Sequence, residues 1–278
     1  MNDDAHIDSH FHIWQLARGD YGWLTPELGV IHRDVQVTDW LAEATPHGVV
    51  GGVLVQAAPT EAETEFLLMQ AEAHEAVLGV VGWVDWLATD APARIAQLAT
   101  HPKLKGLRPM LQDIADPAWV LQTALEPALR AMVAHGLMFD ALITPQHLPH
   151  IETLAKRHPD LRLVIDHAAK PDIASNQWQP WADGLARIAA TTGAFCKISG
   201  LLTEAGDDPS PAVMRPWAQH VLQVFGPQRV VWGSDWPVLQ RAGTYAAWHA
   251  ESAQIFSSLS AADQAAVWGG NARSLYRL

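Results

Sequence analysis

Two histidines separated by one residue end the first apolar run of the chain. His10 and His12 close the stretch Ile7–His12, and side chains two residues apart on a strand face the same side. Two imidazoles that converge on one point can bind a metal ion, donate hydrogen bonds to an oxygen or move protons. A pair of hydrogen-bonded core histidines would have the same spacing, so the motif needs partners elsewhere in the chain.

Two further apolar runs end in groups that could complete such a site. One is followed by Asp166 and His167, and another by Asp235. A carboxylate at the end of an apolar strand is costly unless it is paired or takes part in chemistry. A purely structural role for Asp235, as a cap or in a rim salt bridge, is the alternative. The imidazoles at other strand ends favour a shared site. Three imidazoles and a carboxylate are also a plausible zinc ligand set, here His10, His12, His167 and Asp235.

Side chains from such distant positions can meet only if their strands end at one edge of a sheet. Runs rich in Val, Ile and Leu recur about every 25 to 45 residues, and a helix-like stretch follows each. Most runs are apolar on both faces, as expected of parallel strands packed between helices and a barrel interior. The runs are Ile7–His12, Val49–Gln56, Leu78–Asp85, Leu104–Pro109, Gly136–Ile143, Leu161–His167, Phe195–Gly200 and Val230–Trp236.

Eight strand-helix units in succession predict an α/β protein with one (β/α)8 TIM barrel, a single domain over residues 1–278. An open doubly wound sheet is the alternative, but no Gly-rich dinucleotide fingerprint follows any run. In such barrels the active site forms at the C-terminal ends of the strands, which are the ends that carry the histidines and Asp235. Gly52, Gly106 and Gly233 are expected to face the barrel interior and leave room there.

Composition excludes several classes of function. Lys and Arg total 18 against 30 Asp and Glu, for a net charge of −12, which disfavours nucleic-acid and anionic membrane partners. No apolar run approaches the ~18 residues that span a bilayer, and the chain does not begin like a signal peptide. Cys196 is the only cysteine, so no internal disulfide can form. We therefore expect a cytoplasmic protein.

Several motifs in one order resemble the amidohydrolase superfamily. They are Ile7–His12, Asp166–Pro171, Cys196–Leu201 and Trp232–Pro237, and Asp20–Leu24 and Trp268–Ala272 extend the match nearly end to end. The motifs are most similar to the branch of sugar lactonases and the pyrone-dicarboxylate lactonase, and within it to the L-fuconolactonase and L-rhamnonolactonase types. The resemblance implies a TIM barrel of the amidohydrolase type and a hydrolase that opens a lactone without requiring a metal.

The chain departs from metal-dependent members of the superfamily at two strands. Many of those members carry a histidine on strand five and a carboxylated lysine or glutamate on strand four or five. Here strand five reads Gly136–Ala141 and strand four ends in Arg108, which argues against a binuclear centre. We expect that no cofactor is required, although a single or adventitious zinc could bind. A mononuclear zinc-dependent amidohydrolase or decarboxylase is the alternative function on this fold.

Ester hydrolysis needs an activated water and a group that stabilises the tetrahedral oxyanion. Asp235 is the expected general base, and His10, His12 and His167 are expected to polarise the lactone carbonyl. A non-catalytic sugar-binding protein is a weaker alternative, because it has no need of a carboxylate beside three imidazoles. A deaminase or amidase usually needs the metal that strands four and five do not support.

The side chains expected around the substrate suit an uncharged sugar lactone. A dicarboxylate would call for several arginines, whereas indole faces pack on the apolar face of a sugar ring. The loop over residues 14–30 is expected to cover the strand ends and supply an aromatic contact. The particular sugar, the ring size and the oligomeric state are left open. The expected substrate contacts are Trp23, Gln56, Asp85, Arg108, Asp140, Lys197 and Trp236.

Overall fold

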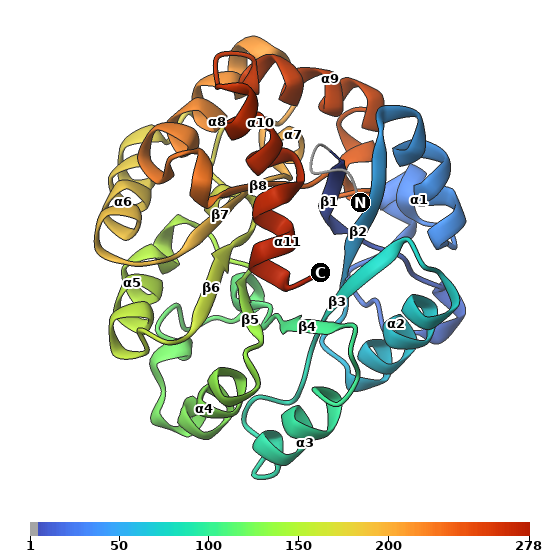
Figure 1. Cartoon of the computed structure of the whole chain (residues 1–278), viewed down its shortest axis with the longest axis vertical. Helices are drawn as coiled ribbons and strands as arrows, with labels where there is room; N and C mark the ends of the chain where they lie inside the picture. Colours follow the sequence, from blue (N-terminus) through green and yellow to red (C-terminus); the bar gives the residue numbers. More distant parts are fainter. Residues whose placement is uncertain (1–4) are drawn as a thin grey trace.

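Eight parallel strands surround one axis in the computed structural model, which describes residues 5–278 (Figure 1). Each strand pairs with the next one in the sequence, in the order β1 to β8. The first and last strands meet at their C-terminal ends, where Asp235 N donates to His10 O at 2.8 Å and His12 N donates to Trp236 O at 2.7 Å. The predicted (β/α)8 barrel is therefore confirmed.

The strands are β1 (His6–Phe11), β2 (Val49–Val55), β3 (Val77–Gly82), β4 (Leu104–Leu107), β5 (Met138–Ala141), β6 (Arg162–Ile165), β7 (Phe195–Ile198) and β8 (Val230–Trp232). The helices are α1 (Val37–Ala44), α2 (Glu61–Ala73), α3 (Ala91–Leu98), α4 (Glu126–His135), α5 (Leu148–Arg157), α6 (Trp178–Thr191), α7 (Leu201–Glu204), α8 (Pro211–Phe225), α9 (Tyr245–Phe256), α10 (Ala261–Ala265) and α11 (Asn271–Tyr276). Among the described residues no helix is long and apolar enough to cross a membrane.

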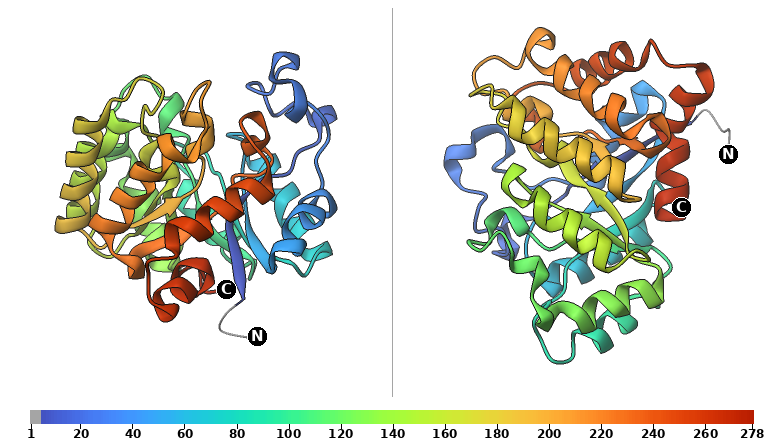
Figure 2. Two further views of the ribbon diagram at one scale, coloured as in Figure 1. Left: turned by 90° about the horizontal axis from the view of Figure 1, so that it is seen from above. Right: turned by 90° about the vertical axis from the view of Figure 1, so that its left-hand side faces the viewer.

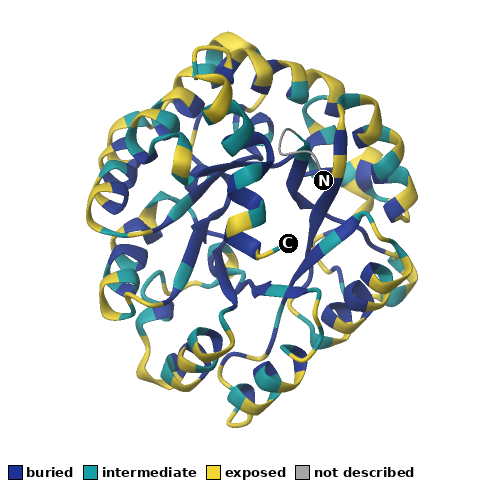
Figure 3. Ribbon diagram, in the orientation of Figure 1, coloured by how far each residue is buried: buried dark blue, intermediate teal, exposed yellow. Residues whose placement is uncertain are grey.

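Two apolar layers hold the barrel together. The larger layer lies between the strands and the surrounding helices, whose outer faces are exposed (Figure 3). The smaller layer fills the barrel interior and includes Ile7, Val53, Val81, Met138 and Val231. Because successive strand residues alternate between these layers, both faces of each strand are buried, as the unbroken apolar runs predict.

Of the three glycines expected inside the barrel, two face the interior layer and one faces the helices. A Cβ on Gly106 would meet Met138, and one on Gly233 would meet His10, so both glycines face inward as predicted. The expectation for Gly52 is wrong, because a Cβ there would lie 2.9 Å from the Trp40 ring on the helix side. Gly52 instead leaves room for an indole that packs against the outside of the sheet.

A β-bulge in β1 directs the histidines inward. Asp8 pairs with Gly52 and Phe11 pairs with Leu54, so three steps on β1 oppose two on β2. Asp8 and Phe11 consequently both face α1, where Asp8 Oδ2 accepts from Trp40 Nε1 at 2.9 Å and Phe11 stacks on the same indole. The residues after the bulge are shifted by one position, and His10 and His12 face the barrel axis.

The two ends of the barrel are built differently. Helix α11 crosses the end at which the strands begin, and its Ala272, Leu275 and Tyr276 pack into the interior layer (Figure 1). Figure 2 places the long connection between β1 and α1 at the opposite end. One end is therefore closed by apolar packing, while the C-terminal ends of the strands remain open to a ligand.

Candidate active site

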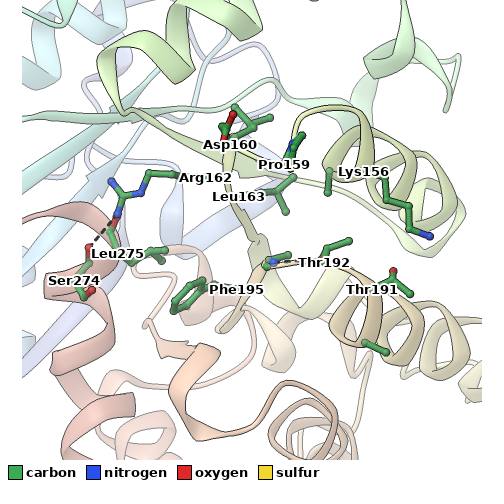
Figure 4. Close-up of a pocket in the computed structure, with 15 residues that line it drawn as sticks. Lys156, Pro159, Asp160, Arg162, Leu163, Thr191, Thr192, Phe195, Ser274 and Leu275 are labelled. Atoms are coloured by element: carbon green, nitrogen blue, oxygen red, sulfur yellow. Dashed lines mark hydrogen bonds between the residues drawn. The ribbon is translucent and has the colours of Figure 1, made fainter.

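A pocket of about 260 Å³ lies at the C-terminal ends of the strands. It is lined by His12, Trp23, Ala57, Arg108, Met110, Gln112, Asp113, Leu142, His167, Lys170, Asp235, Val238 and Arg241. A larger cavity of about 760 Å³ lies where β6 and β7 begin, and there Arg162 is turned toward Ser274 and Leu275 (Figure 4). None of the predicted site residues, all of which are described, lines that larger cavity. The smaller pocket is therefore the candidate active site.

Four side chains converge at the floor of this pocket. Asp235 Oδ1 lies 3.3 Å from His12 Nε2, and 3.8 Å from both His10 Nε2 and His167 Nε2. The Nε2 atoms of His10 and His12 are 3.1 Å apart. The structure thus brings together, from β1 and the ends of β6 and β8, the four residues that sequence reasoning proposed as one site.

The hydrogen bonds of the two β1 histidines fix where their protons lie. His12 Nδ1 is 2.7 Å from Val55 O, and because a carbonyl only accepts, Nδ1 carries the proton. Lys197 Nζ is 3.1 Å from His10 Nδ1, and because an ammonium only donates, a neutral His10 carries its proton on Nε2. His10 Nε2–H therefore donates to the lone pair of His12 Nε2, 3.1 Å away, and both nitrogens lie beside Asp235.

His167 and Asp235 both have left-handed backbone conformations, with φ of 51° and 59°. Such conformations cost energy for residues other than glycine and are concentrated at functional sites. The ring of His167 is held by Ser199, whose Oγ lies 2.8 Å from Nδ1. Gly200 follows, and a Cβ there would lie 2.6 Å from the same Nδ1. The Ser199–Gly200 pair therefore both contacts His167 and makes room for it.

Burial and the local charges set the ionisation of these groups. Burial lowers the pKa of His167 to about 4, and burial together with the Lys197 ammonium holds the pKa of His10 well below its ordinary value. Burial alone would raise the pKa of Asp235, but His167, His12 and His10 outweigh it and hold that pKa well below its ordinary value. At neutral pH the site therefore contains an ionised carboxylate beside two neutral imidazoles, those of His10 and His167.

A buried charge network supports the floor of the pocket from within the barrel. Lys197 Nζ lies 2.6 Å from Asp140 Oδ2 and 2.9 Å from Asp166 Oδ1, and all three side chains are fully buried. Tyr276, from α11, donates to Asp140 at 2.6 Å. Burial, opposed by Lys197, raises the pKa of Asp140 to about 6. The pKa of Asp166 is instead held well below its ordinary value, because Lys197, His10 and Arg108 outweigh its burial.

Four of the expected substrate contacts are buried below or behind the pocket lining. Asp140 and Lys197 have no exposed surface and lie outside the pocket lining, because strand alternation points them into the barrel below the histidines. Gln56 and Trp236 are also buried behind the lining, where Gln56 Oε1 accepts from Arg108 Nε at 2.9 Å. These four residues support the side chains that line the pocket.

The other expected contacts lie at the surface of the pocket or beside it. Trp23 and Arg108 line it, and Trp23 Nε1 donates to Ala57 O at 2.7 Å, which ties the first loop to the end of β2. Asp85 lines a neighbouring hollow instead. Sequence reasoning missed Gln112, Asp113 and Arg241, which loops after β4 and β8 supply, and omitted Asp166 and Lys170 although their motif was identified. Loop conformation carries no periodic signal, which is why the first three were missed.

His10, His12 and Asp235 fit a single zinc ion in type and spacing. Ligand atoms about 2.0–2.1 Å from a tetrahedral zinc lie about 3.3–3.4 Å from each other. The contacts among His10, His12, His167 and Asp235 given above span 3.1 to 3.8 Å. His12 also donates its other ring nitrogen to a carbonyl, as metal-binding histidines commonly do. His10, His12 and Asp235 form one possible metal-binding group, and His10, Asp166 and His167 form another.

Comparison with known proteins identifies the family. The sequence profile described as "Amidohydrolase" matches residues 7–278. The chain belongs to this amidohydrolase family. The resemblance drawn from the strand-end motifs is therefore confirmed, and the match spans the whole barrel.

Three relatives illustrate the similarity. An L-fucono-1,5-lactonase of Burkholderia ambifaria is 46% identical over 276 residues, covering 98% of this chain and 95% of the relative. An L-fucono-1,5-lactonase of Burkholderia multivorans is 35% identical, covering 98% and 96%. A crystal structure of a Burkholderia multivorans amidohydrolase with bound zinc is 33% identical and superposes with a TM-score of 0.93 over 99% of each chain.

Proposed function

We propose that this amidohydrolase hydrolyses a sugar-acid lactone to the open aldonic acid, with L-fucono-1,5-lactone as the first candidate substrate. The observation that carries the proposal is the ionised Asp235 carboxylate facing three imidazoles at the floor of a small pocket. The 46% identity to an L-fucono-1,5-lactonase over nearly the whole chain supports the substrate class. A volume of about 260 Å³ is at the small end for ligand pockets and suits a single sugar ring.

Asp235 acts as the general base in this proposal. Its carboxylate removes a proton from water while the water oxygen bonds to the lactone carbonyl carbon, which gives a tetrahedral oxyanion. When that intermediate collapses, the bond from the former carbonyl carbon to the ring oxygen breaks, and Asp235 returns the proton to the departing ring oxygen. His12 Nε2 lies 3.3 Å from Asp235 Oδ1 and can share the proton once Asp235 has taken it up.

Preformed hydrogen-bond donors stabilise the oxyanion. His10 carries a hydrogen on Nε2 because Lys197 occupies its Nδ1, and it shares that hydrogen with His12 Nε2, 3.1 Å away. Arg108, which lines the pocket, donates through Nε and Nη2 to Gln56 and through Nη1 to Asp166, and its Nη1 also lies 3.4 Å from His10 Nε2. His167 completes the set of polarising groups. One well-placed donor of this kind typically contributes about two to three orders of magnitude in rate.

A zinc ion would be held by His10, His12 and Asp235, whose spacing fits it, with His167 as the expected fourth ligand. When bound, zinc would polarise the lactone carbonyl and lower the pKa of a coordinated water. The side chains retain their own tasks in either case: Val55 O and Ser199 orient the rings of His12 and His167, and Lys197 orients His10. We propose that hydrolysis requires no metal, because Arg108 and His167, which line the pocket, supply the donors that polarise the carbonyl.

Trp23 and the polar groups at the rim bind the sugar in this proposal. The Trp23 indole offers an apolar face to the ring. Gln112 and Asp113 offer acceptors for hydroxyl groups, while Lys170 and Arg241 offer donors. The cations also favour release of the proton from the newly formed carboxylic acid, since they stabilise its carboxylate.

The test is a pH-indicator assay of L-fucono-1,5-lactone and related aldonolactones, because each turnover releases a proton. The purified protein is assayed as isolated, after dialysis against a chelator, and after addition of zinc, with metal content measured in each sample. We expect rapid hydrolysis of one or more sugar lactones, unchanged by chelation. Failure to hydrolyse any aldonolactone would refute the proposed function. Activity lost on chelation and restored by zinc would establish the zinc-dependent alternative.

A further inference from the structure

A second hollow, of about 540 Å³, lies beside the catalytic pocket and shares part of its wall. Trp23, Met110 and Asp113 line both spaces. The hollow is formed by the loops that follow β1, β2, β3 and β4, at the same end of the barrel as the catalytic groups. The two spaces are therefore neighbours that meet at these three residues. We call this space the tryptophan hollow, because Trp23, Trp83, Trp86 and Trp119 line it.

The polar groups of the tryptophan hollow are acidic. Asp85 and Asp113 line it, both are exposed, and neither forms an ion pair within the part of the chain that the structure describes. Asp85 Oδ1 accepts from Leu87 N at 3.2 Å, and its other oxygen is available to a ligand. Asp20 also lines the space, but Arg18 pairs with it at 2.5 Å. Free carboxylates accept hydrogen bonds from hydroxyl groups and repel anionic ligands.

Indole faces beside acceptor carboxylates are suited to a neutral sugar ring. The C–H face of a pyranose packs on an aromatic ring, and its hydroxyl groups donate to carboxylates. The hollow has about twice the volume of the catalytic pocket, so it exceeds what a methyl or hydroxymethyl substituent on a lactone ring would fill. An acidic substituent is excluded by the two unpaired carboxylates.

We propose that the tryptophan hollow is an accessory subsite for a second neutral sugar ring joined by a glycosidic bond to the lactone. The proposal rests on the lactone hydrolysis proposed above and extends it to lactones of disaccharide aldonic acids. In the bound substrate, the lactone ring lies over Asp235 and the histidines, the linkage passes Trp23 and Met110, and the outer ring packs among the indoles. The outer ring takes no part in the chemistry, so it affects KM more than kcat.

The experiment compares the 1,5-lactone of a disaccharide aldonic acid with the lactone of its reducing-end sugar alone. Both are assayed on the full-length protein, on Trp119→Ala and on Asp85→Asn. Neither altered residue lines the catalytic pocket. We expect each variant to reduce kcat/KM for the disaccharide lactone about five- to ten-fold, mainly through KM, and to leave the single-ring lactone within about two-fold.

A matched pair of surface variants guards against loss of folding. Leu87 is 48% exposed and lines the hollow, whereas Met69 is 59% exposed, belongs to α2 and lines neither space. Leu87→Ser is expected to raise KM for the disaccharide lactone, and Met69→Ser is expected to change neither substrate. If the parent hydrolyses single-ring lactones but treats the disaccharide lactone no better, or the variants affect both alike, the subsite is refuted. If the parent hydrolyses no lactone at all, the proposed function itself fails.

Discussion

Replacing Asp235 by asparagine tests the general base alone, because it removes the proton-accepting group and changes little else in the site. The amide keeps the size of the carboxylate and can donate from Nδ2 to the His12 lone pair, so the substrate contacts and the fold are retained. It cannot accept a proton at neutral pH. Removing a general base typically costs about two to four orders of magnitude in rate, or roughly 3 to 5 kcal/mol of transition-state stabilisation. We expect a loss of about 10³-fold in kcat, the middle of that range.

The assay is the pH-indicator reaction with the best single-ring lactone, analysed for kcat and KM separately. Because the lost interaction belongs to the transition state, kcat should fall and KM should change by less than about three-fold. Asp85→Asn is the matched control, since it removes an exposed carboxylate outside the catalytic pocket and should leave this substrate unaffected. An Asp235→Asn enzyme that retains more than a tenth of the parent kcat, with unchanged thermal unfolding, would refute the role of the carboxylate.

Three further predictions concern the supporting residues. The pKa of His167 is about 4 in the folded protein and about 6.5 in the unfolded chain, so protonation favours the unfolded chain. The free energy of unfolding should therefore fall as the pH drops from 6.5 to 4, and this group should not change it above pH 6.5. In His167→Asn, urea titrations across that range should show a decrease in unfolding free energy that is roughly 3 kcal/mol smaller than in the parent. Lys197→Met leaves Asp140 and Asp166 without their shared cation and should lower the unfolding free energy by about 3–5 kcal/mol. Urea unfolding at pH 7 measures this, and a decrease under about 1 kcal/mol would contradict a stabilising role for the Lys197 ion pairs. Burial raises the pKa of the Cys196 thiol, so a chromogenic disulfide reagent should react with it in denaturant and not in the native protein.

The architecture could be predicted because its signal is local. Each strand is a short apolar run, and its burial on both faces distinguishes a barrel strand from a half-exposed one. The candidate catalytic residues could be found for a related reason: His10, His12, His167 and Asp235 all stand at the ends of such runs, and parallel strands in one barrel end on the same face.

Several features could not be predicted, because they depend on side-chain direction rather than on position along the strand. Alternation counted from Gln56 placed Gly52 inside the barrel, whereas Trp40 needs the space on the other face. Lys197 and Asp140 stand at strand ends, but they point to the buried layer below the histidines, where they form an ion pair with each other. The loop residues Asp113 and Arg241 carry no periodic signal at all.

The sequence by itself therefore determined the barrel, the four convergent side chains and the family. Only the tertiary structure decided which polar residues reach the pocket and which form its support. The physical reason is that strand periodicity sets which residues lie at the C-terminal ends of the strands. How deeply a side chain lies below the pocket, and which ring nitrogen of a histidine carries its proton, depend on contacts between distant strands. The bulge that turns His10 inward and the Lys197 contact that leaves its proton on Nε2 both arise from such contacts, across 187 positions of sequence in the second case.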